Sequence, residues 1–258
     1  MMSGMIATTG SARAQSNSTR LEFAATAPAG WVVPGSGMAP RTVRRAELRG
    51  PAGRLEAMLN EGAPNARIAA VVCHPHPLRG GSLHNKVVYH AMKALNDPAW
   101  GLGWPVLRFN FRGVGLSEGR YDGEAEVEDV LSALEWLENE YKTPAVLAGF
   151  SFGAVMALKA CRGGRQAHDV RALAALGLPI AAEGRSYEYS FLQHAIVPKL
   201  FLSGDRDPFA PAAQLRQVAA SAADPKQLIL LPGADHFFTG QLEPMQQILA
   251  SWLKEQFL

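Results

Sequence analysis

The stretch Gly149-Phe150-Ser151-Phe152-Gly153 fits the pattern Gly-x-Ser-x-Gly and decides how the rest of this chain is interpreted. Residues 145–148 before it (Ala-Val-Leu-Ala) predict a short buried strand, and residues 154–160 after it predict the beginning of a helix. A serine on a sharp turn from strand to helix needs glycine neighbours, because a Cβ there would strike nearby backbone. The pattern therefore predicts that Ser151 is an exposed nucleophile; the alternative is a loop serine among small residues.

Apolar runs alternate with amphipathic helical patterns along most of the chain. We expect strands at residues 42–48, 54–59, 67–73, 105–111, 145–148, 173–178, 199–203 and 227–231. We expect helices at residues 86–95, 125–141, 152–161, 210–221 and 241–257. A hairpin followed by repeated strand–helix units predicts an α/β protein, with a mostly parallel eight-stranded sheet and helices on both faces.

The chain of 258 residues is long enough for one sizeable core. Residues 1–40 are rich in Ala, Ser, Thr, Gly and Pro, and predict a flexible N-terminal arm before a catalytic domain at residues 41–258. The arm lacks an early positive charge and a proper apolar stretch, so a signal peptide is not expected. About twenty residues separate the strands at 173–178 and 199–203, which predicts little or no cap.

The composition is that of a globular protein with balanced charge. Hydrophobic residues make up 48% of the chain, and 25 Lys and Arg against 23 Asp and Glu give a net charge of +2. This balance argues against a nucleic-acid surface, and no apolar run is long enough to cross a membrane. Cys73 and Cys161 fall in an expected strand and helix, as buried apolar residues rather than disulfide partners. We expect a cytoplasmic protein; its oligomeric state does not follow from the sequence.

A serine hydroxyl needs a positioned base to act as a nucleophile at neutral pH. Among the three histidines after Ser151, His236 directly follows the last expected strand, at the carboxyl edge of the sheet. His168 lies among polar residues, where a solvated surface position is favoured, and His194 lies in a short connecting helix from which it could line the pocket. We expect His236 to be the base, with an ordinary loop histidine as the alternative.

The acid that orients this base is expected after another strand. Asp207 lies three residues past Gly204, which makes the turn out of the strand at 199–203. Asp205 is the second candidate and is expected to accept hydrogen bonds from loop amides instead. Asp235 neighbours His236, but adjacent side chains usually point apart. We therefore expect Asp207 to hold the imidazole in one tautomer.

Two backbone N–H groups are expected to bind the oxyanion. One belongs to Phe152, directly after the nucleophile. The other is expected in the loop at residues 74–82, whose two prolines have no N–H to donate. His76 or Leu78 remains, and we favour His76.

Two further patterns suggest ligands only weakly. His74-x-His76 has a spacing that turns the two side chains to opposite faces of an extended chain, and no Cys, His or carboxylate cluster accompanies it. The glycines at residues 113–119 partly match a dinucleotide loop, but the third glycine is one place late and no helix start follows. We therefore expect neither a metal nor a cofactor.

Taken together, the motifs resemble those of small bacterial α/β-hydrolases without a lid. The matching segments are residues 74–82, 85–88, 108–115, 149–154, 204–207 and 233–238. They cover most of residues 42–258, and the arm lies outside the resemblance. The resemblance implies an α/β-hydrolase fold and a cofactor-free serine hydrolase of esterase type.

From these residues we expect a carboxylic ester hydrolase that acts on small acyl esters through an acyl-enzyme. Short acyl chains should be preferred, because little or no cap is available to bury long ones. Two alternatives remain open: a thioesterase or peptidase with the same triad, and a catalytically idle hydrolase fold that serves as a binding or scaffold protein.

Overall fold

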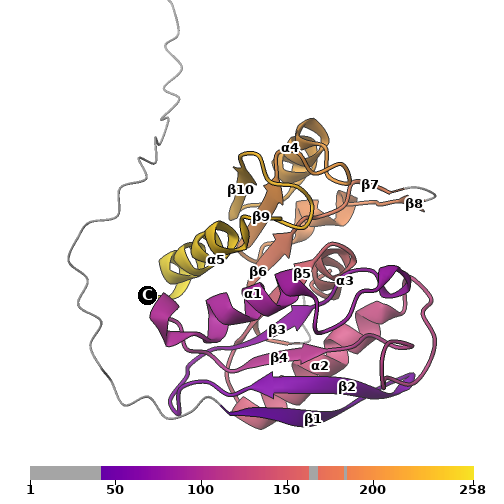
Figure 1. Cartoon of the computed structure of the whole chain (residues 1–258), viewed down its shortest axis with the longest axis vertical. Helices are drawn as coiled ribbons and strands as arrows, with labels where there is room; N and C mark the ends of the chain where they lie inside the picture. Colours follow the sequence, from indigo (N-terminus) through magenta and orange to yellow (C-terminus); the bar gives the residue numbers. More distant parts are fainter. Residues whose placement is uncertain (1–41, 163–167, 183–184) are drawn as a thin grey trace, which may run out of the picture. The chain divides into compact units, whose positions relative to one another are not determined.

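In the computed structural model, which describes residues 42–162, 168–182 and 185–258, eight strands form one sheet. Across the sheet the order is β1 (Val43–Gly50), β2 (Gly53–Asn60), β4 (Val106–Phe109), β3 (Ala69–Cys73), β5 (Ala145–Phe150), β6 (Val170–Leu176), β9 (Lys199–Gly204) and β10 (Lys226–Leu231). Within this sheet of the described residues, only the β1–β2 and β2–β4 pairs are antiparallel. This sheet (Figure 1) confirms the predicted fold class. The arm expected at residues 1–40 lies outside the described residues.

The central strands are buried on both faces, which explains their uninterrupted apolar sequences. In β5, Ala145 and Leu147 belong to the core on one side of the sheet, whereas Val146 and Phe150 belong to the core on the other side. The elements α2 (Glu126–Tyr141), α3 (Phe152–Ala160) and α4 (Ala212–Ser221) cover the first side. The elements α1 (Lys86–Asn96) and α5 (Leu242–Phe257) cover the second. The carboxyl end of β5 therefore lies in the middle of a closely packed sheet.

The expected strand at residues 173–178 is displaced in the structure, where β6 spans Val170–Leu176. Its start was hidden because the exposed Arg171 interrupts the apolar run. Its end comes early because Gly177 has a φ of 53°, which turns the chain out of the sheet. The other expected strands and helices are found within two residues of their predicted bounds.

The connection from β6 to β9 is short. It contains the expected short helix as a 3-10 helix, η3 (Ser190–His194). It also contains a two-stranded pair that was not predicted, β7 (Ala181–Ala182) with β8 (Arg185–Ser186). Strands of two residues have no sequence periodicity, so they could not be detected. Within the described residues, this connection (Figure 1) places no large cap beside the carboxyl edge of the sheet.

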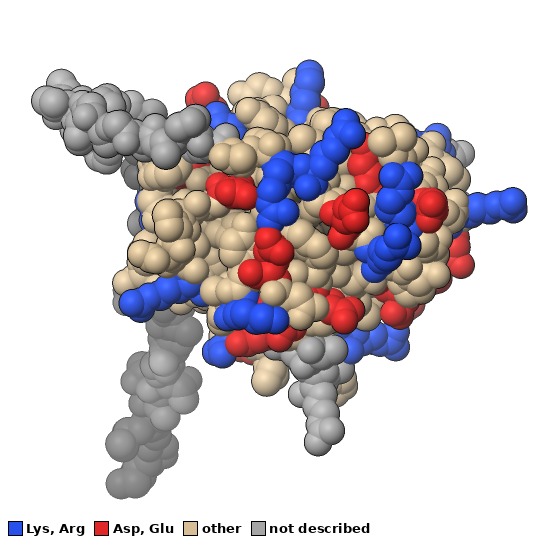
Figure 2. Space-filling view, turned by 90° about the horizontal axis from the view of Figure 1, so that it is seen from below, with Lys and Arg blue, Asp and Glu red and all other residues tan. Residues whose placement is uncertain are grey.

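The edge strand β1 carries alternating charges. Arg45, Glu47 and Arg49 are exposed, whereas Ala46 and Leu48 between them are buried. Charged side chains on an edge strand oppose pairing with another chain. Figure 2 shows Lys and Arg side chains interleaved with Asp and Glu side chains across this side of the molecule, as the balanced composition suggests. No helix among the described residues has both the length and the hydropathy needed to cross a membrane.

Candidate active site

Ser151 lies on a strained turn between β5 and α3. Its φ is 54° and its ψ is −120°, a conformation that side-chain-bearing residues rarely adopt. A Cβ on Gly149 would lie 2.3 Å from the carbonyl oxygen of Gly153, and a Cβ on Gly153 would lie 2.5 Å from the carbonyl oxygens of Cys73 and His74. The two glycines therefore let the turn fold back on itself and let α3 begin against the end of β3.

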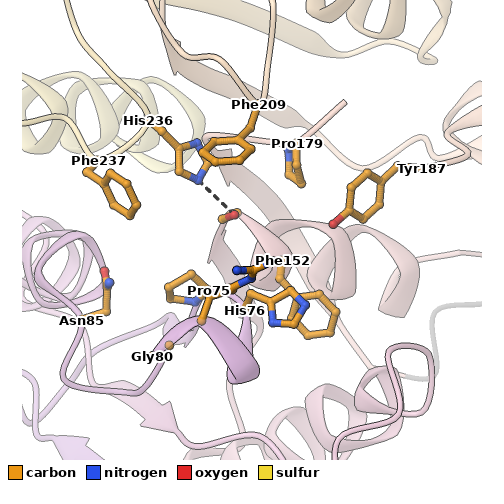
Figure 3. A pocket seen from close by; sticks show the side chains of 13 residues that line it. Pro75, His76, Gly80, Asn85, Phe152, Pro179, Tyr187, Phe209, His236 and Phe237 are labelled. Carbon is orange, nitrogen blue, oxygen red and sulfur yellow. Dashed lines mark hydrogen bonds between the residues drawn. The ribbon is translucent and has the colours of Figure 1, made fainter. Parts of the chain in front are cut away.

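The structure brings Ser151, His236 and Asp207 together, each from a loop at the carboxyl edge of the sheet. Ser151 Oγ lies 3.1 Å from His236 Nε2, the contact marked by the dashed line in Figure 3. His236 Nδ1 lies 2.7 Å from Asp207 Oδ2. A carboxylate can only accept, so Nδ1–H donates to Asp207 and the unprotonated Nε2 accepts the serine hydroxyl proton. This is the arrangement in which an imidazole can deprotonate a serine.

The His236 ring is enclosed by aromatic side chains. The ring centroids of Phe150, Phe209 and Phe237 lie 5.0, 4.7 and 5.1 Å from the imidazole centroid. The residue is only 5% exposed. A buried and enclosed imidazole has little freedom to rotate away from its two hydrogen-bond partners, and the apolar walls strengthen both contacts.

Asp207 is fixed by more than the histidine. Its Oδ1 accepts hydrogen bonds from the backbone N–H of Phe209 at 2.8 Å and of Ala210 at 3.2 Å, and Ser203 Oγ donates to Oδ2 at 3.0 Å. Sequence reasoning missed Ser203. The available signal was one polar residue directly after the apolar run Leu200-Phe201-Leu202 in β9.

The rejected candidates have other partners. Asp205 Oδ1 accepts from the N–H of Gly233 at 2.7 Å, the loop-amide role that the sequence favours. Asp235 accepts from two loop N–H groups, of Phe237 and Thr239, and the bond from Thr239 contributes most to holding its pKa below the usual value. His168 lies 3.0 Å from Glu138, away from the triad. His194 is exposed in η3 and does not line the pocket that contains Ser151.

The loop proposed to supply the second oxyanion donor is shaped by hydrogen bonds to His76. The N–H of Leu78 donates to His76 Nδ1 at 3.1 Å, so it already has an acceptor, which argues against Leu78 as the donor. Because Nδ1 accepts, the ring proton is assigned to Nε2, which donates to Tyr121 Oη at 3.1 Å. Tyr121 was not identified from the sequence, where it is one of several loop residues without a pattern.

His74 has a structural role. Its Nδ1–H donates to the carbonyl oxygen of Pro75 at 2.6 Å, and its Nε2 accepts the N–H of Phe111 at 3.0 Å. Burial lowers the pKa of His74 to about 4, so the ring is neutral at pH 7. Both ring nitrogens are engaged with the protein. No group of three or more metal-ligating side chains occurs in the part of the chain that the structure describes.

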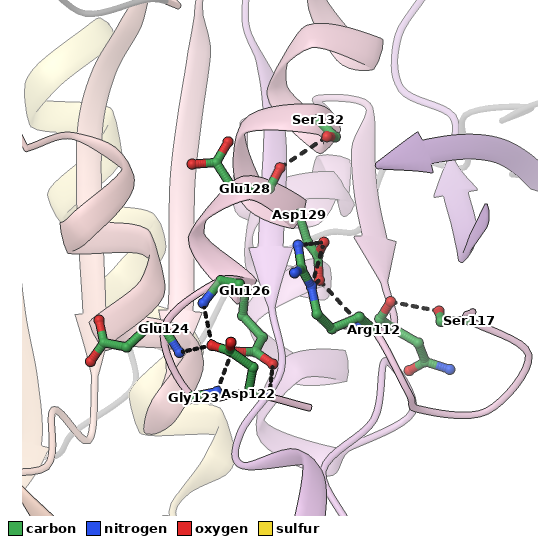
Figure 4. A network of polar contacts seen from close by, with 11 residues as sticks. Arg112, Ser117, Asp122, Gly123, Glu124, Glu126, Glu128, Asp129 and Ser132 are labelled. Carbon is green, nitrogen blue, oxygen red and sulfur yellow. Dashed lines mark hydrogen bonds and ion pairs between the residues drawn. The ribbon is translucent and has the colours of Figure 1, made fainter. Parts of the chain in front are cut away.

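A buried acidic network supports the loop that carries Tyr121 (Figure 4). Arg112 forms a buried ion pair with Asp129, at 2.6 Å between Nη2 and Oδ1, and this hydrogen bonding raises the pKa of Arg112. Glu126, also buried, accepts the N–H of Gly123 at 2.8 Å. Glu126 and Asp129 were not identified from the sequence, because they lie on the otherwise apolar face of α2. The glycine-rich segment thus belongs to a loop braced against α2.

The hydroxyl of Ser151 opens into a cavity of about 440 Å³. Its other walls are mostly apolar or aromatic: Pro75, Phe152, Pro179, Tyr187, Phe209 and Phe237. His76 and His236 complete the surroundings of the serine (Figure 3). The cavity therefore offers apolar surface around one nucleophile and one base, which suits a small molecule with a reactive carbonyl.

Comparisons with known proteins agree with this geometry. Residues 81–248 match the model of the alpha/beta hydrolase domain family. An uncharacterized protein of Rickettsia prowazekii is 36% identical over 215 residues, covering 80% of this chain and 87% of that protein. A serine hydrolase homologue from Coxiella burnetii is 36% identical with a TM-score of 0.72, covering 81% of this chain and 97% of that one.

A third relative can be compared with the short connection between β6 and β9. A serine hydrolase without a lid from Xanthomonas campestris is 31% identical with a TM-score of 0.73, covering 85% of this chain and 97% of that one. The chain belongs to the α/β hydrolase family, and its relatives among solved structures include a serine hydrolase without a lid. This confirms the family predicted from the motifs, and the fold supports hydrolase activity.

Proposed function

We propose that this protein is a carboxylic ester hydrolase that acts through an acyl-enzyme on Ser151. The observation that carries the proposal is the continuous hydrogen-bond chain from Ser151 Oγ through His236 to Asp207, with contacts of 3.1 and 2.7 Å. An α/β hydrolase fold by itself does not define a reaction, so the proposed activity rests on the side chains of this site.

In the proposed mechanism, Ser151 Oγ attacks the acyl carbonyl while His236 Nε2 takes the hydroxyl proton. The N–H groups of Phe152 and His76 stabilise the oxyanion. His236 then returns the proton to the leaving alcohol, and water repeats the sequence to release the acid. Asp207 keeps Nδ1 protonated and stabilises the imidazolium that forms.

The cavity supports a preference for short acyl chains. Its volume of about 440 Å³ is modest, and the described residues between β6 and β9 provide only small elements beside it. A long chain would leave most of its apolar surface in water, so each added methylene would contribute little to binding.

The test is hydrolysis of p-nitrophenyl acetate, butyrate and decanoate by the wild type and by Ser151→Ala. We expect turnover of the two short esters to fall by at least about 10³ in the variant, with the decanoate a poorer substrate for the wild type. Equal rates for both proteins would contradict the proposal. A thioester and an amide of the same acyl group, measured in parallel, identify the leaving group that the site prefers.

A further inference from the structure

The cavity beside Ser151 contains one permanent charge. Arg79 lines it, and no carboxylate is found among the described residues that do so. Arg79 is exposed, lies in the 3-10 helix η1 (Pro77–Arg79), and takes part in none of the ion pairs of the described residues. A guanidinium at the wall of a cavity, with no ion-pair partner among the described residues, is able to bind an anionic group of a ligand in a bidentate contact.

The N-terminus of a helix adds positive potential to the same cavity. Asn85 lines the cavity and caps the N-terminus of α1, where its Oδ1 accepts the N–H of Val87 at 2.9 Å. The positive end of this 11-residue helix therefore faces that wall. In Figure 3, Asn85 and Gly80 lie on one side of the cavity and Tyr187 lies on the other.

A buried cation, Arg108, contacts the segment between Gly81 and Asn85. Arg108 is 5% exposed, and it donates hydrogen bonds to the neutral oxygens of Leu83 and Asn60, at 3.1 and 3.0 Å. Its Nε has no partner among the described residues. Leu83 lies between the cavity-lining residues Gly81 and Asn85 in sequence. Arg108 therefore contacts the segment that carries these two residues, and it takes part in none of the ion pairs of the described residues.

On the side of Tyr187, the cavity adjoins a second cavity whose lining has more acidic than basic residues. A second cavity of about 620 Å³ shares Phe152 and Tyr187 with the first. Its lining includes Asp122, Glu124 and Glu188 as well as two cations, Lys159 and Arg162, and Lys159 is paired with Glu124 at 2.6 Å. Carboxylates outnumber cations in this second lining, so an anion is less favoured there than in the cavity that Arg79 lines.

We propose that the substrate is an ester that carries a carboxylate, and that Arg79 binds this carboxylate in the cavity beside Ser151. This inference rests on the proposed ester hydrolase activity. Arg79 does not touch the reacting atoms; it selects the substrate and orients the ester carbonyl toward Ser151. Because it contacts the anion both before and during reaction, its removal should raise KM more than it lowers kcat.

The experiment compares two pairs of esters that differ only in charge. The first pair is mono-p-nitrophenyl adipate and its neutral terminal amide, with the anion on the acyl side. The second is 4-carboxyphenyl butyrate and 4-carbamoylphenyl butyrate, with the anion on the leaving group. For each pair the ratio of kcat/KM, charged over neutral, is measured for wild type, Arg79→Gln, Arg79→Lys, Arg79→Glu and the control Arg216→Gln, an exposed arginine on α4 that lines neither cavity.

For at least one pair we expect the wild-type ratio to exceed one. We expect it to fall about three- to tenfold in Arg79→Gln and further in Arg79→Glu, to recover partly in Arg79→Lys, and to stay unchanged in Arg216→Gln. Added salt should lower the wild-type ratio, with less effect in Arg79→Gln. Ratios near one in the wild type, or ratios unaffected at position 79, would overturn the inference. Wild-type turnover of the neutral esters tests the proposed activity separately.

Discussion

At the scale of single residues, three carboxylates lie near the proposed base and differ in what their oxygens meet. Asp207 meets the imidazole of His236 and is also held by Ser203 and two backbone N–H groups. Asp205 and Asp235 meet backbone N–H groups instead. Only the carboxylate that contacts Nδ1 can select the tautomer in which Nε2 is free to accept the serine proton.

Asp207→Asn should therefore lower kcat for p-nitrophenyl butyrate by about 10⁴, because an amide can present an N–H to Nδ1 and reverse the tautomer. Asp205→Asn and Asp235→Asn are the matched controls, and each should retain activity to within about tenfold. Steady-state kinetics with circular dichroism of each variant checks this. A larger loss at Asp205 than at Asp207 would show that the acid was assigned wrongly.

The sequence allowed Ser151, Asp207 and His236 to be proposed because each follows a recognisable strand, and strand ends share one edge of a parallel sheet. Ser203 and Tyr121 were missed for a physical reason. Their contacts with Asp207 and His76 are set by how loops meet in space. Residue type and local sequence pattern do not indicate which loops come into contact in the folded protein.

At the scale of elements, the site depends on backbone segments that approach too closely for a side chain. The start of α3 lies against the end of β3 at Gly153, where a Cβ would be 2.5 Å from two carbonyl oxygens. The loops after β9 and β10 approach in the same way, since a Cβ on Gly204 would lie 2.1 Å from the carbonyl oxygen of Ala234. These contacts align the loops that carry Phe152, His76, Asp207 and His236.

Gly153→Ala should push α3 away from the loop at residues 74–82 and misplace one oxyanion donor. We expect kcat to fall by about 10²–10³, the loss typical of removing one such donor. Gly240→Ala is the control: its φ of 72° is strained for alanine, but nothing lies within 4 Å of the added Cβ. It should lower stability by about 1 kcal/mol and leave kcat unchanged. Equal kcat for Gly153→Ala and wild type would show that the close approach at Gly153 does not position the oxyanion donor.

Element types were predictable here because buried parallel strands and amphipathic helices have distinct periodicities. Their ends were less so. The start of β6 depends on its pairing with β5, where Val170 lies opposite Ala145 beside a register shift. The sequence near Val170 does not indicate which strand it pairs with. The β7–β8 pair is shorter than any period a sequence can display.

At the scale of the whole molecule, His74 couples the stability of the domain to pH. Its ring joins the loop after β3 to the N–H of Phe111 after β4, and burial lowers its pKa from 6.5 to about 4. Between pH 6.5 and 4 the unfolded chain binds a proton at His74 that the folded protein does not. Stability must therefore fall as the pH is lowered through this window.

We expect the free energy of unfolding to fall by about 3 kcal/mol across this window through His74 alone. Urea unfolding at several pH values measures it. His74→Gln should be less stable than wild type at pH 7, because the ring hydrogen bonds change, yet its stability should vary less between pH 6.5 and 4. Parallel curves for the two proteins would show that His74 does not titrate as described.

The proposed ester hydrolysis requires that His236 makes Ser151 nucleophilic. A fluorophosphonate probe tests this activation directly. Mass spectrometry of the labelled wild type should locate one phosphonyl group on Ser151, with no label in Ser151→Ala and much slower labelling in His236→Ala. A wild type that stays unlabelled, or that is labelled at another residue and still hydrolyses esters, would contradict it.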